Sequence, residues 1–341
     1  MYKLFGSEIS PYSIKVKSYL KFKNIKFKWI TKSKSKEFNE NAKLPLIPLL
    51  LKNDDESLQD STIIIENIER EFPLNSIYPE DSRLIFLAAL LEEYADEWMN
   101  KHMFHYRWSY EPDQNLTSKR IAADIIPLYI KYLPIISSLA LEKGAETIKK
   151  RMIPRLSFVG SNENNKDQIE KSFKRLIDLL ENHLRKFSYL FGGRPSIADF
   201  AFWGQLYNCW IDITARNFIN QRPNLVKWLK RMENPKVVGD FVGWGDVHLT
   251  IEPILEMEVA GLFLPWSNAN QKALISNKES FSIDLENKKF IQNTQKYHAK
   301  SLKEIKLKYN EFSVKESIKP ILKNTGCLNY LGEENEFEMG D

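Results

Sequence analysis

The first 77 residues alternate strand-like and helix-like hydrophobic patterns in an order that few folds can accept. A short apolar run at 3–6 predicts a strand, and a second strand is predicted at 27–30. Between them, the apolar residues of 11–23 recur at mostly helical spacing, and Pro11 stands in the first turn, where its missing N–H is not needed. This stretch is therefore predicted to be a strand, a helix and a strand.

The second part of this segment predicts an antiparallel pair of strands. Residues 49–51 and Leu58 are strand-like and are separated by the polar turn 53–56, and a helix that ends before a proline is predicted over 61–72. Two parallel strands joined by a crossover helix, followed by a strand pair and a helix, are typical of a thioredoxin-like module. We expect such a domain over residues 1–77.

The segment 82–235 is predicted to be an all-helical bundle. From residue 169 onward, apolar side chains recur at the spacing of one helix face, so this helix is expected to bury a stripe against a core. The stripe consists of Ile169, Phe173, Leu176, Leu180, Leu184 and Phe187. Ser196, followed three residues later by Asp199 and then by an apolar run, forms a capping box that predicts a buried helix from about residue 197.

The remaining segment, 236–341, is predicted to be a mixed extension. Residues 281–285 alternate between apolar and polar, and 290–291 can return after a turn at 286–288, which predicts a hairpin with one apolar face. A helix is expected to follow, with apolar residues along one side. These residues are Leu302, Ile305, Tyr309 and Phe312. The whole chain is thus expected to be an α+β protein of three parts.

Composition and charge exclude several classes of protein. The 49 basic and 45 acidic side chains leave a net charge of +4 over 341 residues, too small an excess to indicate a nucleic-acid partner. The longest apolar runs, such as 44–51, are far shorter than the roughly 20 residues that a membrane-spanning helix needs. The first residues read as a strand and not as a signal peptide. We expect a cytoplasmic protein with no nucleic-acid or membrane partner.

Glycine and cysteine usage excludes two kinds of binding site. Gly6 is the only glycine before Gly144, so the first 143 residues contain no glycine-rich phosphate loop. Cys209 and Cys327 are 118 positions apart and the five histidines are scattered, so neither zinc-site spacing nor a dithiol pair is present. No metal cofactor is expected, and any catalysis must come from less conspicuous groups.

Three motifs in the first 77 residues carry a resemblance to a known family. The segment Ser10–Ser13 reads Ser-Pro-Tyr-Ser at the first strand-to-helix junction, where members of the thioredoxin and glutaredoxin group carry Cys-Pro-Tyr-Cys. Ile47–Leu50 is similar to a Val-Pro-Val-Leu segment whose proline is cis, and Gln59–Ser61 is similar to a Glu-Ser or Asp-Ser helix start. These motifs resemble the glutathione transferase superfamily, several classes of which carry a serine at the junction.

The second predicted domain supports the same resemblance. The segment Gly193–Phe200 is similar to the capping box of the superfamily's all-helical domain, and Pro223–Trp228 is similar to its closing helix. The motifs occur in the family's order over residues 1–235. The segment after 236 lies outside the ordinary pattern of the family.

The resemblance implies glutathione as co-substrate and Ser10 as the residue that stabilises its thiolate. A hydroxyl in front of the helix can donate a hydrogen bond to the sulfur, and the free N–H groups of the helix favour an anion there. As an alternative, Ser10 only caps its own helix. Ser13 lies one turn into the helix, where the second thiol of a disulfide pair would stand, and is expected to contribute packing or a secondary hydrogen bond.

Four further residues are expected to hold the tripeptide. A cis bond between Ile47 and Pro48 would turn the Ile47 backbone groups toward an extended peptide, and the alternative is an ordinary trans turn. Asp60 and Ser61 begin a helix, where the donors of Ser61 suit the γ-glutamyl carboxylate and Asp60 can meet the ammonium group. As an alternative, both are only capping residues.

The acceptor substrate is expected to lie against the helical domain. Residues 92–108 are dense in aromatic and ionisable side chains. The residues expected to line the pocket are Tyr12, His105, Arg107 and Trp108. The alternative is that this segment packs in the core at its helix ends and leaves its charges solvated. A metal site built on the two histidines of this segment lacks a clear third ligand.

The predicted function is that of a glutathione transferase-like enzyme that transfers alkyl or aryl groups by attack of the thiolate on a small electrophile. Conjugation, dehalogenation, ether cleavage and isomerisation can all follow from one activated thiolate. The alternative is a noncatalytic protein of the same fold that acts as a docking module, which the long extension favours. The resemblance also implies a homodimer in which the first domain meets the partner's helices, a contact that the extension could block or replace.

Overall fold

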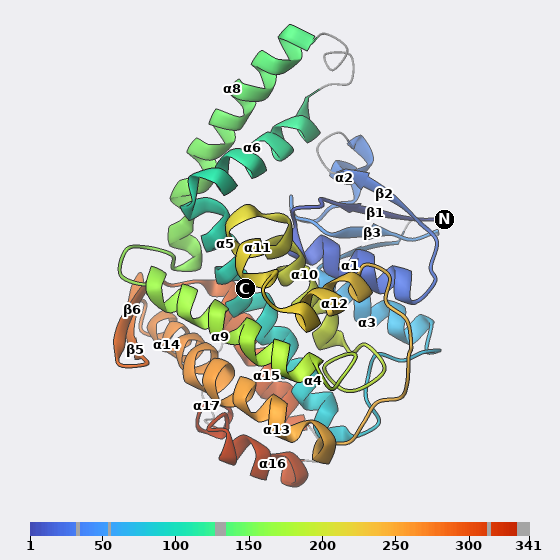
Figure 1. Ribbon diagram of the computed structural model, residues 1–341, viewed down its shortest axis with the longest axis vertical. Coiled ribbons are helices and arrows are strands. Elements are labelled where there is room, and N and C mark those ends of the chain that lie inside the picture. Colours follow the sequence, from blue (N-terminus) through green and yellow to red (C-terminus); the bar gives the residue numbers. More distant parts are fainter. Residues whose placement is uncertain (32–34, 54–55, 127–133, 312–314, 333–341) are drawn as a thin grey trace.

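The computed structural model describes residues 1–31, 35–53, 56–126, 134–311 and 315–332 (Figure 1). Over this part of the chain, a four-stranded sheet and a two-stranded hairpin accompany a large assembly of helices. The predicted α+β fold class is confirmed. Residues 54–55 of the predicted turn and Phe312 of the predicted helix stripe lie outside the described residues.

The first domain carries the predicted order of elements, with one addition. Its sheet has the strand order β2-β1-β3-β4, in which β1 and β2 are parallel and the other neighbours are antiparallel. The elements are β1 (Tyr2–Gly6), α1 (Pro11–Phe22), β2 (Phe27–Thr31), α2 (Lys36–Asn41), β3 (Leu49–Leu51), β4 (Ser57–Gln59) and α3 (Ser61–Glu71). The sequence did not indicate α2, because a helix of six residues is too short to show a periodic pattern.

Alternation along the strands divides the apolar residues between the two faces of this sheet. Leu4 and Leu50 belong to the main core, together with apolar residues of α1 and α3. Phe5 and Leu49 belong to a second, smaller cluster that Phe38 of α2 completes. The sheet therefore has helices on both faces, and α1 lies on the face that meets the helical domain.

The helical domain is organised around α10, a buried helix that contacts α1, α4 and α5. Its elements are α4 (Ser82–Tyr94), the π-helical turn η2 (Ala95–Met99), α5 (Asn100–Ser109), α6 (Glu111–Ile125), α8 (Pro134–Met152), the 3-10 turn η3 (Ile153–Val159), α9 (Lys166–Leu184), α10 (Ile197–Ile211), α11 (Ile213–Ile219) and α12 (Pro223–Met232). The predicted capping bond is present, because the Asp199 carboxylate accepts from the Ser196 N–H at 2.9 Å. In Figure 1, α6 and α8 pack together and project from the rest of the molecule.

The extension begins with helices that the sequence did not indicate and continues with the predicted hairpin. Its elements are α13 (Trp244–Ile254), the π-helical segment η4 (Leu255–Phe263), α14 (Leu264–Ile275), β5 (Ser280–Leu285), β6 (Lys288–Asn293), α15 (Lys296–Glu311), α16 (Lys315–Asn324) and α17 (Leu328–Leu331). In the hairpin, Ile283 pairs with Phe290. Glu286 and Asn287 form the turn with φ angles of 49° and 62°, as a tight two-residue hairpin turn requires.

The extension packs into the core of the helical domain. Trp266 of α14 lies against Trp98 with ring centroids 5.7 Å apart, and Tyr309 of α15 lies 5.8 Å from Phe86 of α4. Glu258 of η4 is fully buried and accepts hydrogen bonds from side chains of α4 and α9. One hydrophobic core therefore spans both parts, and the boundaries 1–77, 82–235 and 236–341 stay predictions about how the chain is organised.

The longest helices of the described chain, α8 and α9, have 19 residues each; charged side chains run along α9 and occupy the second half of α8. Within the described residues, no helix combines the length and the apolar composition that crossing a membrane requires.

Candidate functional site

The start of α1 is fixed by its own sequence and by the helical domain. Ser10 is the N-cap: its Oγ accepts a hydrogen bond from the Ser13 N–H at 3.3 Å, and Pro11 fills the first helical position. From the helical domain, Gly204 of α10 lies so close to the Pro11 carbonyl oxygen that a Cβ would approach this oxygen to less than 3.0 Å. A glycine is therefore needed for α10 to pack against the start of α1.

Arg107 of α5 holds the loop that leads into α1. Its Nη1 donates to the Ile9 carbonyl oxygen at 2.8 Å, its Nε donates to Asp212 Oδ2 at 2.6 Å, and its Nη2 donates to Asn208 Oδ1 at 2.8 Å. Both members of the ion pair are buried, so these additional hydrogen bonds offset part of the cost of removing the two charges from water. The guanidinium of Arg107 is thus committed to groups of the protein itself.

A pocket of about 360 Å³ lies beside Ser10, between the start of α1, α5 and η3. Its lining is mostly apolar and aromatic. The lining residues are Ile9, Ser10, Pro11, Tyr12, Asn100, Met103, Phe104, Arg107, Trp108, Ile121, Met152, Arg155, Phe158 and Val159. A concave apolar surface with a few polar groups is typical of a site for a small molecule.

Tyr12 contributes a neutral phenol to this pocket. Its hydroxyl donates to the backbone carbonyl oxygen of Asp96 at 2.9 Å. Burial, assisted by the negative charge of Asp96, raises the pKa of Tyr12 well above its ordinary value. Near neutral pH the phenol therefore stays protonated, and Tyr12 offers aromatic surface and not an anion.

A second hollow, of about 620 Å³, adjoins the pocket, since Ile9 and Ile121 line both. Its other lining residues are Gly6, Ser7, Thr31, Ser35, Lys36, Asn39, Ile47, Asp124 and Ile125. The peptide bond between Ile47 and Pro48 is cis. We refer to these two adjoining hollows, which together reach from α2 to the start of α1, as the groove.

The extension reaches the start of α3. Asp60 caps this helix with a φ of 84°, and its Oδ1 accepts from the Thr62 N–H at 2.9 Å. The other oxygen, Oδ2, accepts a hydrogen bond from Tyr297 Oη of α15 at 3.2 Å. Ser61, the first residue of α3, is buried. Asp60 and Tyr297 are 237 residues apart, so no local sequence pattern could indicate their contact.

A cluster of charges lies where the first domain, α4 and the extension meet. Lys15 of α1 is buried, and its Nζ donates to Glu92 at 2.7 Å and to Asp96 at 2.6 Å. Burial, partly offset by Lys15, raises the pKa of Asp96 to about 6. Burial and the charge of Glu92 raise the pKa of Glu93 to about 8, and the Glu93 carboxyl group accepts from the Ser301 hydroxyl of α15. This junction should therefore respond to protonation.

Four of the residues selected from the sequence line the pocket, namely Ser10, Tyr12, Arg107 and Trp108. Ile47 lines the adjoining hollow, and Pro48 is buried next to it. Ser13 lies elsewhere: its side chain is fully buried beside Gly6, and its hydroxyl has no hydrogen-bond partner within the described residues. Ser13 contributes its backbone N–H to the site, where it donates a hydrogen bond to Ser10 Oγ.

The two histidines of α5 are not among the residues that line the pocket. Nδ1 of His105 lies 2.8 Å from Ser161 Oγ, and its Nε2 lies 3.2 Å from Glu170. His102 lies 2.8 Å from Ser172 Oγ, and burial lowers the pKa of His102 to about 3. Among the residues that the structure describes, no group of three His, Cys, Asp or Glu side chains is arranged to hold a metal ion.

Sequence reasoning missed the wall of the pocket that η3 provides. Arg155, Phe158 and Val159 belong to this turn, and Met152 ends the preceding helix α8. A short 3-10 turn has no helical periodicity, so its side chains could not be assigned to a face from the sequence.

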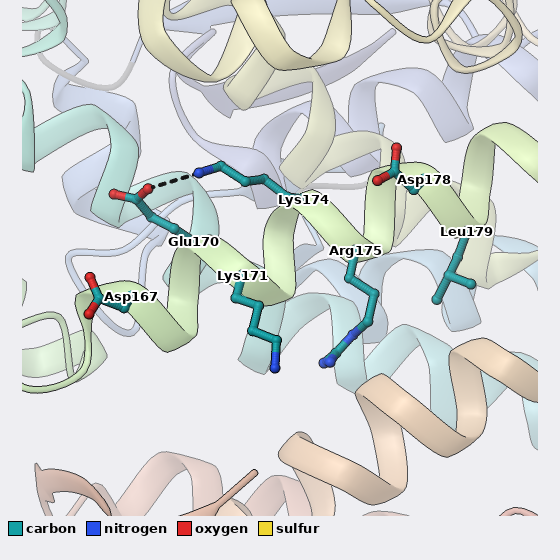
Figure 2. A pocket seen from close by; sticks show the side chains of 7 residues that line it. All are labelled: Asp167, Glu170, Lys171, Lys174, Arg175, Asp178 and Leu179. Carbon is teal, nitrogen blue, oxygen red and sulfur yellow. Dashed lines mark hydrogen bonds and ion pairs between the residues drawn. The ribbon is translucent and has the colours of Figure 1, made fainter. Parts of the chain in front are cut away.

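A further hollow, of about 600 Å³, runs along the exposed face of α9 (Figure 2). Its basic side chains have acidic neighbours: Lys174 pairs with Glu170 at 3.3 Å, and Lys171 pairs with Glu286 at 2.7 Å. Arg175 pairs with Glu286 as well. Because these charges are already compensated, we interpret this face as a solvated surface to which the β5–β6 hairpin attaches, and not as a ligand site.

Two family models match this chain. The model described as "Glutathione S-transferase, N-terminal domain" matches residues 4–76, and the model described as "Glutathione S-transferase, C-terminal domain" matches residues 163–231. The first match contains Ser10 and Asp60, and the second contains the whole of α10. Neither match reaches the extension.

This chain is distantly similar to individual proteins and to solved structures. The chain is 20% identical to the isoprene-epoxide–glutathione S-transferase of Rhodococcus sp. (strain AD45) over 231 residues, which cover 66% of this chain and 92% of that protein. Among solved structures, it is similar to the beta-etherase LigF from Sphingobium sp. strain SYK-6, with a TM-score of 0.46 and 18% identity over 74% of this chain and 99% of that chain. It is also similar to glutathione transferase F7 from Populus trichocarpa, with a TM-score of 0.43 and 17% identity over 74% and 99% of the two chains.

Proposed function

This chain belongs to the glutathione transferase superfamily, and on that premise we propose that it binds glutathione along the groove from α2 to α1 and uses the thiolate to attack a small electrophile. The observation that carries this proposal is the position of Ser10, which stands at the start of a helix and lines a mostly apolar pocket of about 360 Å³. The sulfur would lie at Ser10, and the electrophile would lie in the pocket.

The role proposed for Ser10 is compatible with its capping role. A serine hydroxyl has one donor hydrogen and two acceptor lone pairs. The Ser13 N–H uses one lone pair, so the hydrogen remains for the sulfur. A thiol with a pKa of about 8.5 is only about 3% thiolate at pH 7, and lowering that pKa by about two units, worth about 2.7 kcal/mol, makes the thiolate the major form. The positive end of α1 acts in the same direction.

The rest of the tripeptide would lie in the adjoining hollow and against α3. The Ile47 backbone would pair with the extended peptide, and the N–H groups at the start of α3, with Ser61, would receive the γ-glutamyl carboxylate. Lys36 lines the hollow and offers a positive charge to the carboxylate at the other end of the tripeptide. Asp60 would meet the ammonium group with the oxygen that accepts from Tyr297.

The reaction that we propose is the transfer of an alkyl or aryl group to the glutathione sulfur. The thiol first loses its proton to solvent. The sulfur lone pair then forms a carbon–sulfur bond, and the leaving group departs with the electrons of the bond that breaks. The protein contributes by holding the anion at Ser10 and by placing the electrophile against it in a largely apolar pocket.

A second candidate function has a specific observation in its favour. The extension, which neither family match includes, packs on α4 and supplies Tyr297 to Asp60. In a noncatalytic docking module of this fold, that contact would permanently cover the start of α3, where the γ-glutamyl end of glutathione would bind. Such a protein would not bind glutathione at millimolar concentration.

We also propose that the protein is cytoplasmic and forms a homodimer, as the family resemblance implies. Because α15 and α16 pack on α4, the partner would have to contact surfaces that the extension leaves open. Light scattering tests this: a mass of twice 40.0 kDa supports the homodimer, and a mass of 40.0 kDa contradicts it.

Glutathione binding separates the enzyme from the docking module. For the enzyme, glutathione at a hundredfold excess over Kd should raise the free energy of unfolding by about 2.7 kcal/mol. Ser10→Ala should still bind glutathione but lose the thiolate absorbance and the turnover of a chlorodinitrobenzene. Ser282→Ala, an exposed substitution on the β5–β6 hairpin, should behave as the wild type. The absence of any thermal shift at millimolar glutathione would contradict the enzyme.

A further inference from the structure

One charged group in the pocket beside Ser10 has no counter-ion among the residues that the structure describes. The pocket contains two arginines, and none of its described lining residues is acidic. Arg107 is committed to Asp212, Asn208 and the Ile9 carbonyl oxygen. Arg155 makes one weak contact, from Nη1 to Met152 Sδ at 3.9 Å, and forms no ion pair within the described part of the chain. The Arg155 guanidinium is therefore available to a ligand.

Asp96 is in contact with the pocket lining but does not bring its carboxylate to the lining residue that it contacts. Asp96 meets Tyr12 only through its backbone carbonyl oxygen. Its carboxylate accepts from Lys15 at 2.6 Å and so belongs to the buried cluster behind the pocket. The pocket thus keeps a positive charge that a bound molecule can neutralise.

We propose that this pocket is specific for flat, apolar electrophiles that carry one carboxylate or a comparable anionic group, and that Arg155 binds this group. The inference rests on the proposed function, since it names the substrate class of the same site. Arg155 would act as a specificity-determining residue, and Ser10 would hold the attacking sulfur.

The remaining lining fits such a molecule. Tyr12, Phe104, Trp108 and Phe158 present aromatic surface, and the rings of Phe104 and Trp108 lie 6.3 Å apart. An aromatic ring buried among them gains both apolar burial and ring–ring contacts. A guanidinium binds a carboxylate through two parallel N–H···O bonds, which fixes the orientation of the ring as well as its charge. None of the described residues that line this pocket offers a counter-ion to a cationic substrate.

A matched pair of electrophiles tests this inference. A chloronitrobenzoate and the corresponding chloronitrobenzamide have the same ring and leaving group and differ by one negative charge. In both, the thiolate sulfur bonds to the ring carbon, the carbon–chlorine bond breaks, and chloride leaves with the electron pair. Expressing each variant's kcat/KM relative to the wild type cancels the difference in intrinsic reactivity between the two compounds.

For Arg155→Met, we expect kcat/KM for the benzoate to fall at least about tenfold, equivalent to about 1.4 kcal/mol, while the value for the benzamide stays within about twofold. Arg155→Lys should keep most of the benzoate activity, because the charge is retained. Arg151→Met removes the same charge from an exposed position of α8 outside the lining and should change neither value. Equal losses for both compounds in Arg155→Met, or no loss, would overturn the inference.

A binding measurement keeps this inference apart from the proposed function. An unreactive nitrobenzoate that enters the pocket should quench the fluorescence of Trp108. Suppose that glutathione is not activated but that the nitrobenzoate binds in an Arg155-dependent manner. The proposed function is then wrong, whereas the specificity of the pocket for an anionic group stands. If glutathione is activated but nitrobenzoate and nitrobenzamide bind equally well, the assignment of the pocket is wrong.

Discussion

Nη1 of Arg107 lies 2.8 Å from the carbonyl oxygen of Ile9. Ile9 directly precedes Ser10, so a side chain of α5 sets the position at which α1 begins. The same guanidinium pairs with the buried Asp212. The geometry around Ser10 therefore depends on an ion pair in the helical domain, and Arg107 acts as a positioning residue.

Replacing Arg107 should cost both stability and glutathione affinity. Arg107→Met deprives the buried Asp212 of its main partner, which we expect to lower the free energy of unfolding by about 3–5 kcal/mol in chemical denaturation. The double variant Arg107→Met/Asp212→Leu should regain much of the stability but not the affinity, because the Ile9 carbonyl stays released. Arg185→Met, at an exposed position, should stay within about 0.5 kcal/mol of the wild type. Full recovery of affinity in the double variant would disprove the positioning role.

A methyl group at position 204 should disturb the start of α1. Because a Cβ there would lie within 3.0 Å of the Pro11 carbonyl oxygen, Gly204→Ala forces α1 and α10 apart. We expect a loss of about 1–3 kcal/mol in the free energy of unfolding, together with weaker glutathione binding. The control is Gly245→Ala on α13, where no atom lies within 4 Å of the new methyl group, and it should be neutral or stabilising. A Gly204→Ala protein as stable as this control would contradict the close packing.

Removing the Tyr297 hydroxyl should improve glutathione binding. In the structure this hydroxyl donates to Asp60 Oδ2, the oxygen proposed to meet the ammonium group of the ligand. Since a hydrogen bond of this kind contributes about 0.5–1.5 kcal/mol, we expect Tyr297→Phe to lower the Kd about threefold in titration calorimetry and to leave kcat unchanged. Tyr330→Phe, on α17, is the matched control. Weaker binding by Tyr297→Phe would show that the hydroxyl serves the ligand and does not compete with it.

Protonation of Glu93 should couple stability to pH. Burial and the charge of Glu92 raise the pKa of Glu93 from 4.5 to about 8, and the charges of Asp96 and Lys308 also act on it. Because its pKa is higher in the folded state, the stability that Glu93 contributes is complete below pH 4.5 and is lost as the pH rises through about 8. We expect the Tm to fall over this range and Glu93→Gln to flatten the fall. The same slope in both proteins would rule out this coupling.

The order of elements in the first domain could be predicted because each element buries a short, local pattern. The strands alternate, α1 carries a proline in its first turn, and Asp60 begins α3 as a capping residue. The hairpin of the extension was predictable for the same reason, since Ile283 and Phe290 lie on paired strands joined by a tight turn. Local patterns determine local structure.

The faces of the segment 92–108 could not be predicted. The π-helical turn Ala95–Met99 widens the helix in the middle of this segment, so a fixed helical period does not carry through it. As a result, Trp98 packs in the core with the extension, whereas Arg107 and Trp108 reach the pocket. One part of the segment therefore packs in the core, as the alternative interpretation expected, and another part lines the pocket.

Contacts between segments that are distant in the sequence could not be predicted either. Tyr297 contacts Asp60 across 237 residues, and Arg155, on a turn between two helices, lines the same pocket as Ser10. Such contacts depend on how helices pack together, and each partner taken alone has the sequence context of an ordinary surface residue.

The pKa of the glutathione thiol in the complex, titrated through its thiolate absorbance, tests the role of Ser10 most directly. In the wild type we predict a value about two units below the free value of about 8.5. In Ser10→Ala, at equal occupancy by glutathione, we predict a return toward the free value. A bound thiol that keeps its free pKa in the wild type, or a lowered pKa that survives the loss of the Ser10 hydroxyl, would contradict thiolate stabilisation by this residue.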